Sequence, residues 1–559
     1  MYRSGIGRFS LFSILIFLTL IVGCERRDQI KSGDEDIDVM ISKMSLEEKI
    51  GQLLMPSLQT WTEENVTDYH LGGVILFKEN FENPSQTKKM IQSLQEQAEI
   101  PLMIAVDQEG GLVTRIPFIP RMPGNMALGA TGDPQLAEEV GFVIGTELRH
   151  LGINVNFAPV LDINSNPDNP IIGVRSFGDQ PDLVSKFGIA YMKGLNQAGV
   201  ISVGKHFPGH GDVDADSHLV LPTSGRTLNQ LKDFELKPFI ALIQNNIPAI
   251  MTAHIEFPNI ESKTIISKKD GLPIGLPATF SSKLLTDLLR DELGFLGVLF
   301  SDAMNMNAVS QHFDPVESAI MAIEAGVDVI LMPEQIENVY KGLLEAVHSG
   351  RLKEARIDDS VNRILRLKKE YLFGRSESEK TDARTIETMD TQEIEQRVAN
   401  VSITVLQNDG ILPIKIKDEE KLVIIGTDRV SLQRLAEQVQ SYHENTQIVL
   451  FDRFANYSGK ITEVQNRILS DAAKMIIVTN TRTKEDKDPN AWKIKTIQQA
   501  INKGIPSVVI SAGNPYDFTV IDGNQAYIAQ YDFGEASFKA SCEVIFGKRQ
   551  AKGRLPVSK

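Results

Sequence analysis

The chain has 559 residues, 42% of them hydrophobic, and a formal net charge of −15. This length and apolar content exclude a disordered protein and predict roughly two to four domains. The acidic balance argues against a nucleic-acid-binding protein, which needs a basic face.

The N-terminus has the composition of an export signal. Two arginines precede an apolar run over residues 9–22 that is too short to cross a bilayer comfortably, which predicts a signal peptide at residues 1–23. The run ends in Leu-Ile-Val-Gly before Cys24, and this ending resembles the bacterial lipoprotein box. The resemblance implies that Cys24 is lipidated and becomes the mature N-terminus. An ordinary signal peptide or an uncleaved anchor are the alternatives. Residues 24–36 then form a polar tether.

The next part of the chain alternates apolar strand-like runs with amphipathic helical stretches. A capping box at residues 45–48 predicts a helix that runs through Leu54. Repeated βα units of this kind build parallel sheets, and because the strand candidates approach eight, we expect a (β/α)8 TIM-type barrel over residues 37–373. Residues 356–371 are its closing basic helix. The strand candidates are residues 73–77, 102–106, 155–159, 200–204, 249–253, 298–301 and 327–332.

The composition changes after the barrel. Residues 374–390 are polar and lack an apolar period, so they are interpreted as an interdomain linker. Beyond them we expect a smaller three-layer αβα sandwich domain over residues 391–559, which makes the fold class α/β with two domains. Its four predicted strands are residues 421–427, 447–451, 475–479 and 507–511.

Two cysteines occur in the sequence, Cys24 and Cys542. If Cys24 carries lipid, Cys542 has no partner, and the exported protein must be stable without a disulfide. Cys542 lies in a helical-looking run over residues 535–546. We therefore expect a buried core thiol without chemistry of its own.

Polar residues gather where the predicted barrel strands end. Asp107 follows the second strand candidate, Lys205 and His206 follow the fourth, and Asp302 follows the sixth. Side chains at the carboxyl ends of parallel barrel strands converge on one mouth, which predicts a shared site. A lone aspartate there is weak evidence because helix N-caps often use Asp. Three such strand ends together are stronger evidence.

The loop KHFPGHGDVDADSH, residues 205–218, contains three histidines and three alternating aspartates. The aspartates match the first positions of an EF-hand, but Ser217 replaces the turn glycine and Thr223 replaces the bidentate glutamate, which argues against calcium. The histidines lack the helical spacing of a zinc site, since Pro208 and Gly209 interrupt the loop. We therefore expect no metal and no cofactor.

A catalytic interpretation fits this loop better. Asp216 and His218 are two residues apart, so the carboxylate can fix the imidazole tautomer and favour its charged form. Such a histidine can donate a proton and later take one back, while Asp302 can act as the nucleophile of a double displacement. This is the chemistry of a retaining glycosidase in which an Asp–His pair replaces the second carboxylic acid.

At these residues the chain resembles the family 3 glycoside hydrolases, in particular their β-N-acetylglucosaminidase branch in its two-domain lipoprotein form. The resemblance covers nearly all of the mature chain, and the DSH ending of the long loop separates this branch from members that take their acid from another domain. The family's frequent arginine after VDxEGG is Leu112 here. The matching motifs are VDQEGG (106–111), NFAPVLDI (156–163), RSFG (175–178), KHFPGHG with DSH (205–218), SDAM (301–304), GNPYD (513–517) and GRLPV (553–557).

The resemblance implies a role for each matching residue. Asp302 is expected to be the nucleophile, His218 the acid/base and Asp216 its partner. The alternatives to a sugar-binding role are a structural ion pair for Arg175 or Lys205 and a hydrogen-bonded core position for His206. The expected binding site for a terminal N-acetylglucosamine consists of Asp107, Arg115, Arg175, Lys205 and His206.

Three functions compete at this point. The favoured one is a retaining exo-β-N-acetylglucosaminidase acting on a cell-wall glycan or muropeptide, anchored by its N-terminal lipid to the periplasmic or extracellular face of a bacterial membrane. The second is a phosphorylase or a β-glucosidase of the same family. Phosphorolysis is considered because a histidine acid/base repels an incoming phosphate less than a carboxylate does. The third is a non-enzymatic sugar-binding lipoprotein, which does not require every catalytic position to be filled. The expected partner in each case is a carbohydrate, not a nucleic acid, and the membrane is contacted through the lipid only.

Overall fold

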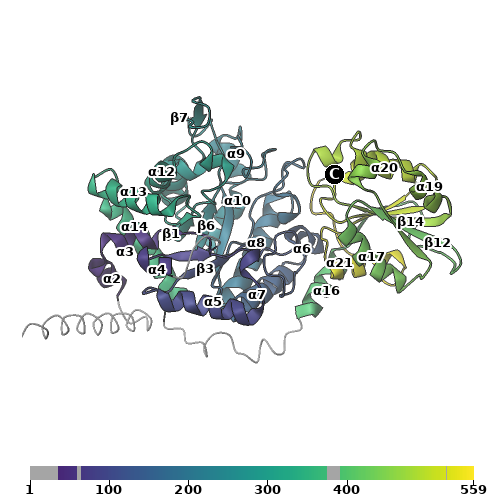
Figure 1. Cartoon of the computed structure of the whole chain (residues 1–559), viewed down its shortest axis with the longest axis horizontal. Helices are drawn as coiled ribbons and strands as arrows, with labels where there is room; N and C mark the ends of the chain where they lie inside the picture. The colour runs from purple at the N-terminus through teal and green to yellow at the C-terminus, as the bar shows by residue number, and fades with distance from the viewer. Residues whose placement is uncertain (1–35, 59–63, 374–390, 524, 559) are drawn as a thin grey trace, which may run out of the picture.

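The computed structural model describes residues 36–58, 64–373, 391–523 and 525–558. The predicted signal peptide, Cys24 and the linker at 374–390 therefore lie outside the described residues. The described chain forms two bodies that lie side by side along the long axis of the molecule (Figure 1). Within these ranges, no helix combines the length and the hydropathy needed to cross a bilayer.

The first body is a closed parallel barrel. Six strands form one parallel sheet in the order β2 (Gly73–Ile75), β3 (Met103–Val106), β4 (Val155–Asn156), β5 (Ile201–Phe207), β6 (Ala249–Thr252) and β9 (Val298–Phe300). A second pair, β1 (Leu54–Met55) and β10 (Ile330–Leu331), is also parallel. Parallel bridges from Ser57 to Ile75 and from Phe300 to Val329 join the two sheets at both edges. The described strands thus close a ring of eight, which confirms the predicted TIM-type barrel.

Strand β1 corrects the sequence-based helix that was expected to run through Leu54. The capping box does form, since the Ser45 hydroxyl accepts the Glu48 N–H at 3.2 Å and the Glu48 carboxylate accepts the Ser45 N–H at 2.6 Å. The helix, α3 (Leu46–Gln52), ends before Leu54 because the chain pairs with β10. A strand of two residues shows no alternation in the sequence, so its pairing partner decides its conformation.

Helices surround the barrel strands (Figure 1). Several begin with a proline in the first turn, where a missing N–H costs nothing. The larger helices are α5 (Pro84–Gln97), α7 (Pro134–Leu151), α8 (Pro181–Gln197), α10 (Lys237–Gln244), η5 (Lys283–Glu292, a π-helix), α12 (Pro315–Ala325), α13 (Ile336–His348) and α14 (Glu354–Tyr371). The smaller elements are α2 (Ile37–Lys43), α4 (Glu64–Asp68), η2 (Lys78–Asn80), α6 (Asn125–Thr131), η3 (Gly173–Arg175), α9 (Leu228–Asp233), the hairpin β7 (Thr264–Ile266) and β8 (Pro273–Gly275), η4 (Ala278–Phe280) and α11 (Asn307–Ser310).

One buried carboxylate ties the late helices to the barrel. Asp328, which precedes β10, accepts Arg290 of η5 at 2.7 Å and Arg363 of α14 at 2.9 Å, and Arg356 lies 3.7 Å away. Burial opposes ionisation, but the three guanidinium groups outweigh it and lower the pKa of Asp328. Asp328 therefore balances the charges of three arginines that surround it.

The second body is a three-layer αβα sandwich, as predicted. Its sheet has the order β11 (Thr404–Asn408), β16 (Gln525–Ala529), β15 (Ser507–Ser511), β14 (Ala472–Thr479), β12 (Lys421–Gly426) and β13 (Thr446–Leu450), with only the β11–β16 pair antiparallel. The four predicted strands are present, and β11 and β16 are additions. The helical layers are α16 (Thr391–Ser402), α17 (Arg429–Gln440) and α21 (Glu535–Ile545) on one face, and α19 (Glu463–Ser470) and α20 (Trp492–Ile501) on the other; the short helices are α18 (Arg453–Asn456), η7 (Glu485–Lys487) and η8 (Asp517–Thr519).

Alternate residues of the central strands reach the two helical layers. Leu422 and Ile424 of β12 pack with one hydrophobic cluster, while Val423 and Ile425 pack with the other. Cys542 on α21 is free and fully buried in the first of these clusters. It is the core thiol that the sequence predicts.

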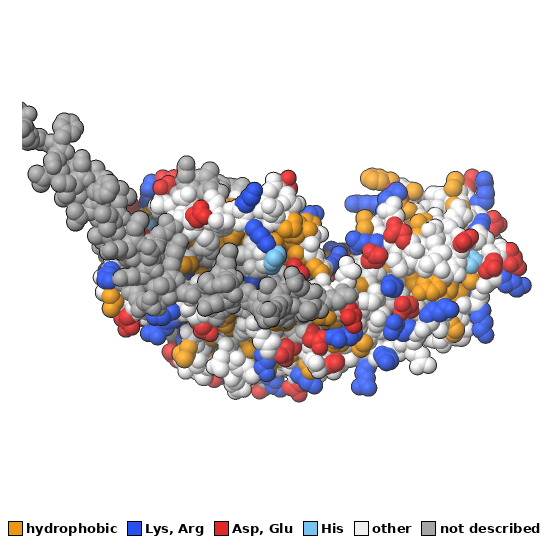
Figure 2. Space-filling view, turned by 90° about the horizontal axis from the view of Figure 1, so that it is seen from below, with side chains coloured by type: hydrophobic (Ala, Val, Ile, Leu, Met, Phe, Trp, Pro, Cys, Tyr) orange, Lys and Arg blue, Asp and Glu red, His pale blue; other side chains and the backbone are white. Residues whose placement is uncertain are grey.

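The two domains share a small apolar core. Met126 and Ala130 of α6 and Val174 of η3 pack against Tyr516 and Tyr531 of the second domain. The Lys487 ammonium adds an ion pair with Asp168 at 2.6 Å. On the face that Figure 2 shows, cationic and anionic side chains are mixed over both domains. The second domain therefore packs on the barrel beside the η3 segment that carries Arg175.

Candidate active site

Asp302 lies directly after β9 at the carboxyl end of the barrel. Its backbone N–H donates to the Thr252 hydroxyl at 3.3 Å, and its own carboxylate accepts the Ala303 N–H at 2.8 Å. Burial raises the pKa of Asp302, but the imidazoles of His206 and His254 outweigh this effect and lower it overall. The carboxylate is therefore ionised at neutral pH, as a nucleophile requires.

His254 is a neighbour of Asp302 that the sequence reasoning missed. It follows β6, is fully buried, and its ring nitrogens lie 2.8 Å from the Thr279 hydroxyl and 3.2 Å from the Ala303 carbonyl oxygen. Burial lowers the pKa of His254. The His254 ring thus holds the turn that presents Asp302. Its only signal in the sequence is its position after an apolar run.

His206 is held in place by a second buried carboxylate. The Asp162 carboxylate lies 2.6 Å from Nδ1 of His206 and also accepts the backbone N–H groups of His206 at 3.2 Å and His210 at 2.7 Å. Burial opposes the ionisation of Asp162, but the His206 ring outweighs it and lowers its pKa. His206 is thus oriented by Asp162, a residue inside the NFAPVLDI motif to which the sequence analysis gave no role.

Lys205 and Arg175 converge on Glu109, and Lys205 also pairs with Asp107. The Lys205 ammonium lies 2.6 Å from Asp107 and 2.7 Å from Glu109, and the Arg175 guanidinium forms two hydrogen bonds to Glu109 at 2.8 and 3.0 Å. Burial opposes the ionisation of Glu109, yet the two cations lower its pKa well below the usual range. Arg175 and Lys205 therefore do form ion pairs, the alternative considered from sequence. Asp107 is the more exposed member, with 18% of its side chain accessible.

Arg115 retains free hydrogen-bonding capacity. The Gln108 side chain fixes its backbone by accepting the Arg115 N–H at 2.9 Å, and the guanidinium lies 5.7 Å from the centre of the Phe77 ring. Its Nε is buried without a hydrogen-bond partner within the described residues. A buried guanidinium N–H without a partner is suited to donate a hydrogen bond to a polar ligand group.

The expected Asp216–His218 pair lies on the long loop after β5. Nδ1 of His218 is 2.9 Å from the Asp216 carboxylate, which also accepts the His218 backbone N–H at 2.8 Å. The His218 side chain is 61% exposed, and its charge contributes to lowering the pKa of Asp302. Because Asp216 holds Nδ1, Nε2 of the imidazole is open for proton transfer.

The base of this loop is fixed at several points. Nε2 of His210 lies 3.1 Å from the Ser217 hydroxyl, and the Arg226 guanidinium donates to Asp212 at 3.0 Å. Through these contacts, His210 and Asp212 stabilise the conformation of the loop. Among the described residues, no group of three or more His, Cys, Asp or Glu side chains is arranged to hold a metal ion.

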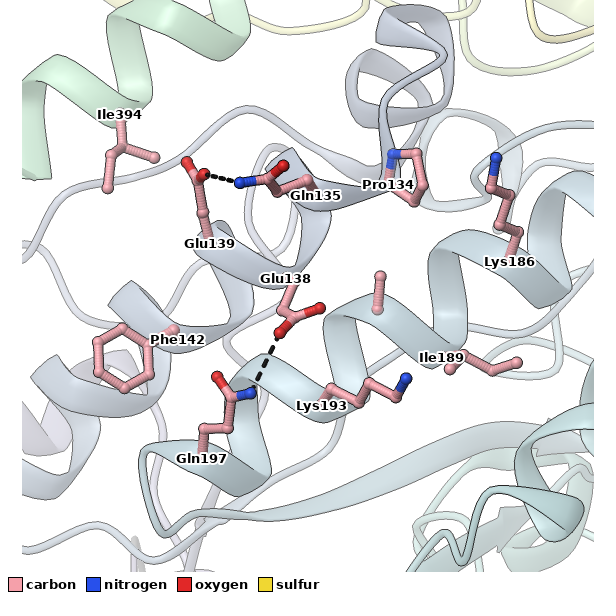
Figure 3. Close-up of a pocket in the computed structure, with 11 residues that line it drawn as sticks. Pro134, Gln135, Glu138, Glu139, Phe142, Lys186, Ile189, Lys193, Gln197 and Ile394 are labelled. Carbon is pink, nitrogen blue, oxygen red and sulfur yellow. Dashed lines mark hydrogen bonds between the residues drawn. The ribbon is translucent and has the colours of Figure 1, made fainter.

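A separate hollow lies on the outside of the barrel (Figure 3). It has a volume of about 650 Å³ and lies between α7 and α8, with Ile394 of α16 at one side. Hydrogen bonds drawn in the figure join Gln197 to Glu138 at 3.1 Å and Gln135 to Glu139 at 3.3 Å. None of the strand-end residues reaches this hollow, so the candidate active site is the barrel mouth.

Comparison with known proteins identifies the family of this chain. The model of the glycosyl hydrolase family 3 N-terminal domain matches residues 45–367, and that of the family's C-terminal domain matches residues 403–559. The chain belongs to glycoside hydrolase family 3. It is an α/β glycoside hydrolase with the two-domain architecture of that family.

Individual family 3 relatives match most of the chain. "Beta-hexosaminidase A" of Pseudoalteromonas piscicida is 33% identical, covering 90% of this chain and 92% of the relative. A solved family 3 β-N-acetylglucosaminidase from Paenibacillus sp. str. FPU-7 is 34% identical, with a TM-score of 0.80, covering 92% of this chain and 99% of the other. A fungal multi-domain family 3 β-N-acetylglucosaminidase is 30% identical, with a TM-score of 0.83, covering 92% of this chain and 61% of the other.

One departure from the family pattern has a structural counterpart. Leu112, at the position where the family often has arginine, is half-buried and packs against the apolar core shared by the two domains. The side chain thus contributes to the domain interface, where a guanidinium group would have to be desolvated.

Proposed function

We propose that this protein is a retaining exo-β-N-acetylglucosaminidase that releases terminal, non-reducing β-linked N-acetylglucosamine from cell-wall-type glycans or muropeptides. The observation that carries the proposal is the Asp216–His218 pair, which holds Nδ1 of the exposed imidazole at 2.9 Å on the loop after β5, while Asp302 lies after β9 at the same carboxyl end of the barrel. The printed names of the Pseudoalteromonas and Paenibacillus relatives support the choice of an amino sugar.

In the first step, a carboxylate oxygen of Asp302 attacks the anomeric carbon of the terminal sugar. The bond from that carbon to the leaving oxygen breaks as Nε2 of His218 donates its proton to the oxygen. Because the pKa of Asp302 is lowered, the nucleophile is already ionised when the substrate binds. The products of this step are a free aglycone and a glycosyl ester on Asp302.

In the second step, His218 acts as a base. Its neutral Nε2 takes a proton from a water molecule, whose oxygen attacks the anomeric carbon and releases the Asp302 carboxylate. Two inversions give retention of configuration. Asp216 holds Nδ1 at 2.9 Å, so that the proton is given and taken at Nε2.

The remaining residues of the mouth hold the sugar in this proposal. Asp107, Arg115 and Lys205 offer charged partners to the hydroxyl groups, and such groups fix one pose of a polar ligand. His206 is oriented by Asp162 and acts electrostatically on the nucleophile. Arg175 contributes through its two bonds to Glu109.

An activity panel tests the proposal. Aryl β-glycosides of N-acetylglucosamine and glucose are incubated with the full chain, with and without inorganic phosphate, and the released sugars are identified. We expect N-acetylglucosamine as the product in both buffers. Glucose release from the glucoside alone would support a β-glucosidase instead. Sugar binding without turnover of either glycoside would support the non-enzymatic alternative.

Phosphorolysis is a second candidate that one observation favours. The acid/base position holds an imidazole and not a carboxylate, so an incoming phosphate meets less negative charge near the intermediate. Glycosyl phosphate as the main product in phosphate buffer would replace hydrolysis with phosphorolysis.

We further propose that the protein is exported and anchored to a bacterial membrane through a lipid on Cys24. The sequence pattern before Cys24 supports this, and the first described helix, α2, begins at Ile37 directly after the tether. Metabolic labelling with a tagged fatty acid is the test. Cys24→Ala should lose the label and leave the membrane fraction, whereas Cys542→Ala should keep it. A labelled Cys24→Ala protein would contradict the anchor.

A further inference from the structure

We propose that Asn514 of the second domain is a positioning residue for the sugar site of the barrel, acting through Arg175. This inference deepens the proposed function and rests on it. It assigns a task to the second domain, which contributes no group of its own to the Asp216, His218 and Asp302 constellation.

Asn514 is held rigidly by its own domain. It follows β15, is 6% exposed, and its backbone N–H donates to the Thr481 carbonyl at 3.2 Å. Its carbonyl oxygen accepts the hydroxyls of Ser511 at 3.0 Å and Thr481 at 3.1 Å. Its side-chain amide donates to the Arg482 carbonyl at 3.3 Å. The carboxamide oxygen therefore has a fixed position from which to act on the barrel.

The carboxamide oxygen of Asn514 accepts a hydrogen bond from the first turn of η3. Oδ1 of Asn514 accepts the Val174 N–H at 2.8 Å, which satisfies a backbone donor that a short helix leaves unpaired. Gly173 makes the approach possible. Its φ is +43°, and a Cβ at this position would lie 2.2 Å from the same oxygen. The glycine and the asparagine thus form a matched contact across the domain interface.

Arg175 follows Val174 in the chain, so the contact fixes the start of its side chain. The Arg175 guanidinium makes two bonds to Glu109 and a third to the Ile171 carbonyl at 3.2 Å. A bidentate arginine–carboxylate pair depends on the position of the backbone that carries the arginine. If η3 shifts, Glu109 loses one of its two cations.

The consequence reaches the exposed edge of the network. Lys205 is shared between Glu109 and Asp107 at 2.7 and 2.6 Å. If the Arg175–Glu109 pair weakens, the buried Glu109 attracts the Lys205 ammonium more strongly. The ion pair between Lys205 and Asp107, the proposed sugar ligand, then weakens. We therefore expect a loss of substrate binding, while Asp302 and His218 keep their chemistry.

Steady-state kinetics of the full chain test the inference, with whichever aryl glycoside the wild type cleaves. Asn514→Ala should raise KM about tenfold and leave kcat within about twofold, since the hydrogen bond to Val174 is lost together with the one to the Arg482 carbonyl. Asn514→Asp keeps an acceptor oxygen and should recover most of the wild-type KM. Arg397→Ala, which removes an ion pair with Glu139 across the same interface, is the matched control and should leave KM unchanged.

A double-mutant cycle separates positioning from general support of the interface. If Asn514 acts through Arg175, Asn514→Ala should add less than about twofold to KM in an Arg175→Lys background. Multiplication of the two effects, or a wild-type KM for Asn514→Ala, would overturn the inference. If Asn514→Ala does not fold, Gly173→Ala disturbs the same contact from the barrel side and should raise KM. An unchanged KM for Gly173→Ala would also overturn the inference. A wild type that cleaves no glycoside contradicts the proposed function instead.

Discussion

Asp162 holds His206 twice, through the ring Nδ1 at 2.6 Å and through the backbone N–H at 3.2 Å. The carboxylate is fully buried, and the ring that it orients acts electrostatically on Asp302. The nucleophile's ionisation thus depends on a residue that does not touch it.

Asp162→Asn should move the acid limb of the activity profile. Asparagine cannot give the His206 ring the same anionic partner, so the electrostatic effect of that ring on Asp302 should weaken and the pKa of the Asp302 carboxyl should rise. Because the nucleophile must be ionised, the acid limb of kcat/KM should shift to higher pH. A pH profile of the variant and the wild type measures the shift, and an unmoved acid limb would contradict the coupling.

Asp302→Asn should reduce kcat by roughly 10⁴-fold or more, since an amide cannot form the glycosyl ester. The fold should persist because the amide oxygen can still accept the Ala303 N–H. Kinetics together with circular dichroism measure both effects. A folded variant with wild-type turnover would remove Asp302 from the nucleophile role.

His218→Ala should distinguish substrates by their leaving group. An activated aryl group leaves without much protonation, whereas a natural disaccharide needs the proton from Nε2. The loss of kcat/KM should therefore be larger for the disaccharide than for the aryl glycoside. Equal losses for both substrates would argue against an acid role.

Asp328→Asn should destabilise the barrel by about 3–5 kcal/mol, because three arginines lose the charge that compensates their burial. The matched control is Glu317→Gln, which weakens an exposed pair with Arg351 and should cost about 1 kcal/mol or less. Chemical denaturation of both variants gives the comparison. If both variants lost a similar free energy of unfolding, the Asp328 charge would not be needed to compensate the three buried arginines.

Lys368→Met should stabilise the protein in a pH-dependent way. Lys368 on α14 is fully buried, donates to the Gln52 side chain at 2.7 Å, and burial lowers its pKa from 10.5 to about 7. The folded state thus disfavours the charged form. This cost is fully present below pH 7, falls by about 1.4 kcal/mol per pH unit as the pH rises, and is gone above pH 10.5.

Thermal unfolding at two pH values checks this linkage. The gain in Tm from Lys368→Met should be larger at pH 7 than at pH 9.5, whereas the exposed neighbour Lys369→Met should show no such difference. An equal gain from Lys368→Met at both pH values would mean that packing, not charge, is responsible.

Much of the architecture follows from local patterns in the sequence. Apolar runs of four or more residues predict most of the barrel strands and four of the six strands of the second domain, because buried parallel strands are continuous in hydrophobicity. The Asp216–His218 pair is local too, since two residues of separation are enough to bring the side chains together. Strands such as β1, with two residues, and β16 could not be predicted, because their pairing partners decide them.

By itself, the sequence determined the barrel, the second domain, the strand ends that carry Asp107, Lys205 and Asp302, and the motifs of the glycosidase family. Only the tertiary structure decided which charges meet. Glu109 joins Lys205 to Arg175, Asp162 holds His206, and Asn514 reaches Val174 from 340 residues away. Local composition fixes where a strand ends, but a buried charge takes its partner from whatever element folding brings beside it, and that choice is not encoded within any one segment.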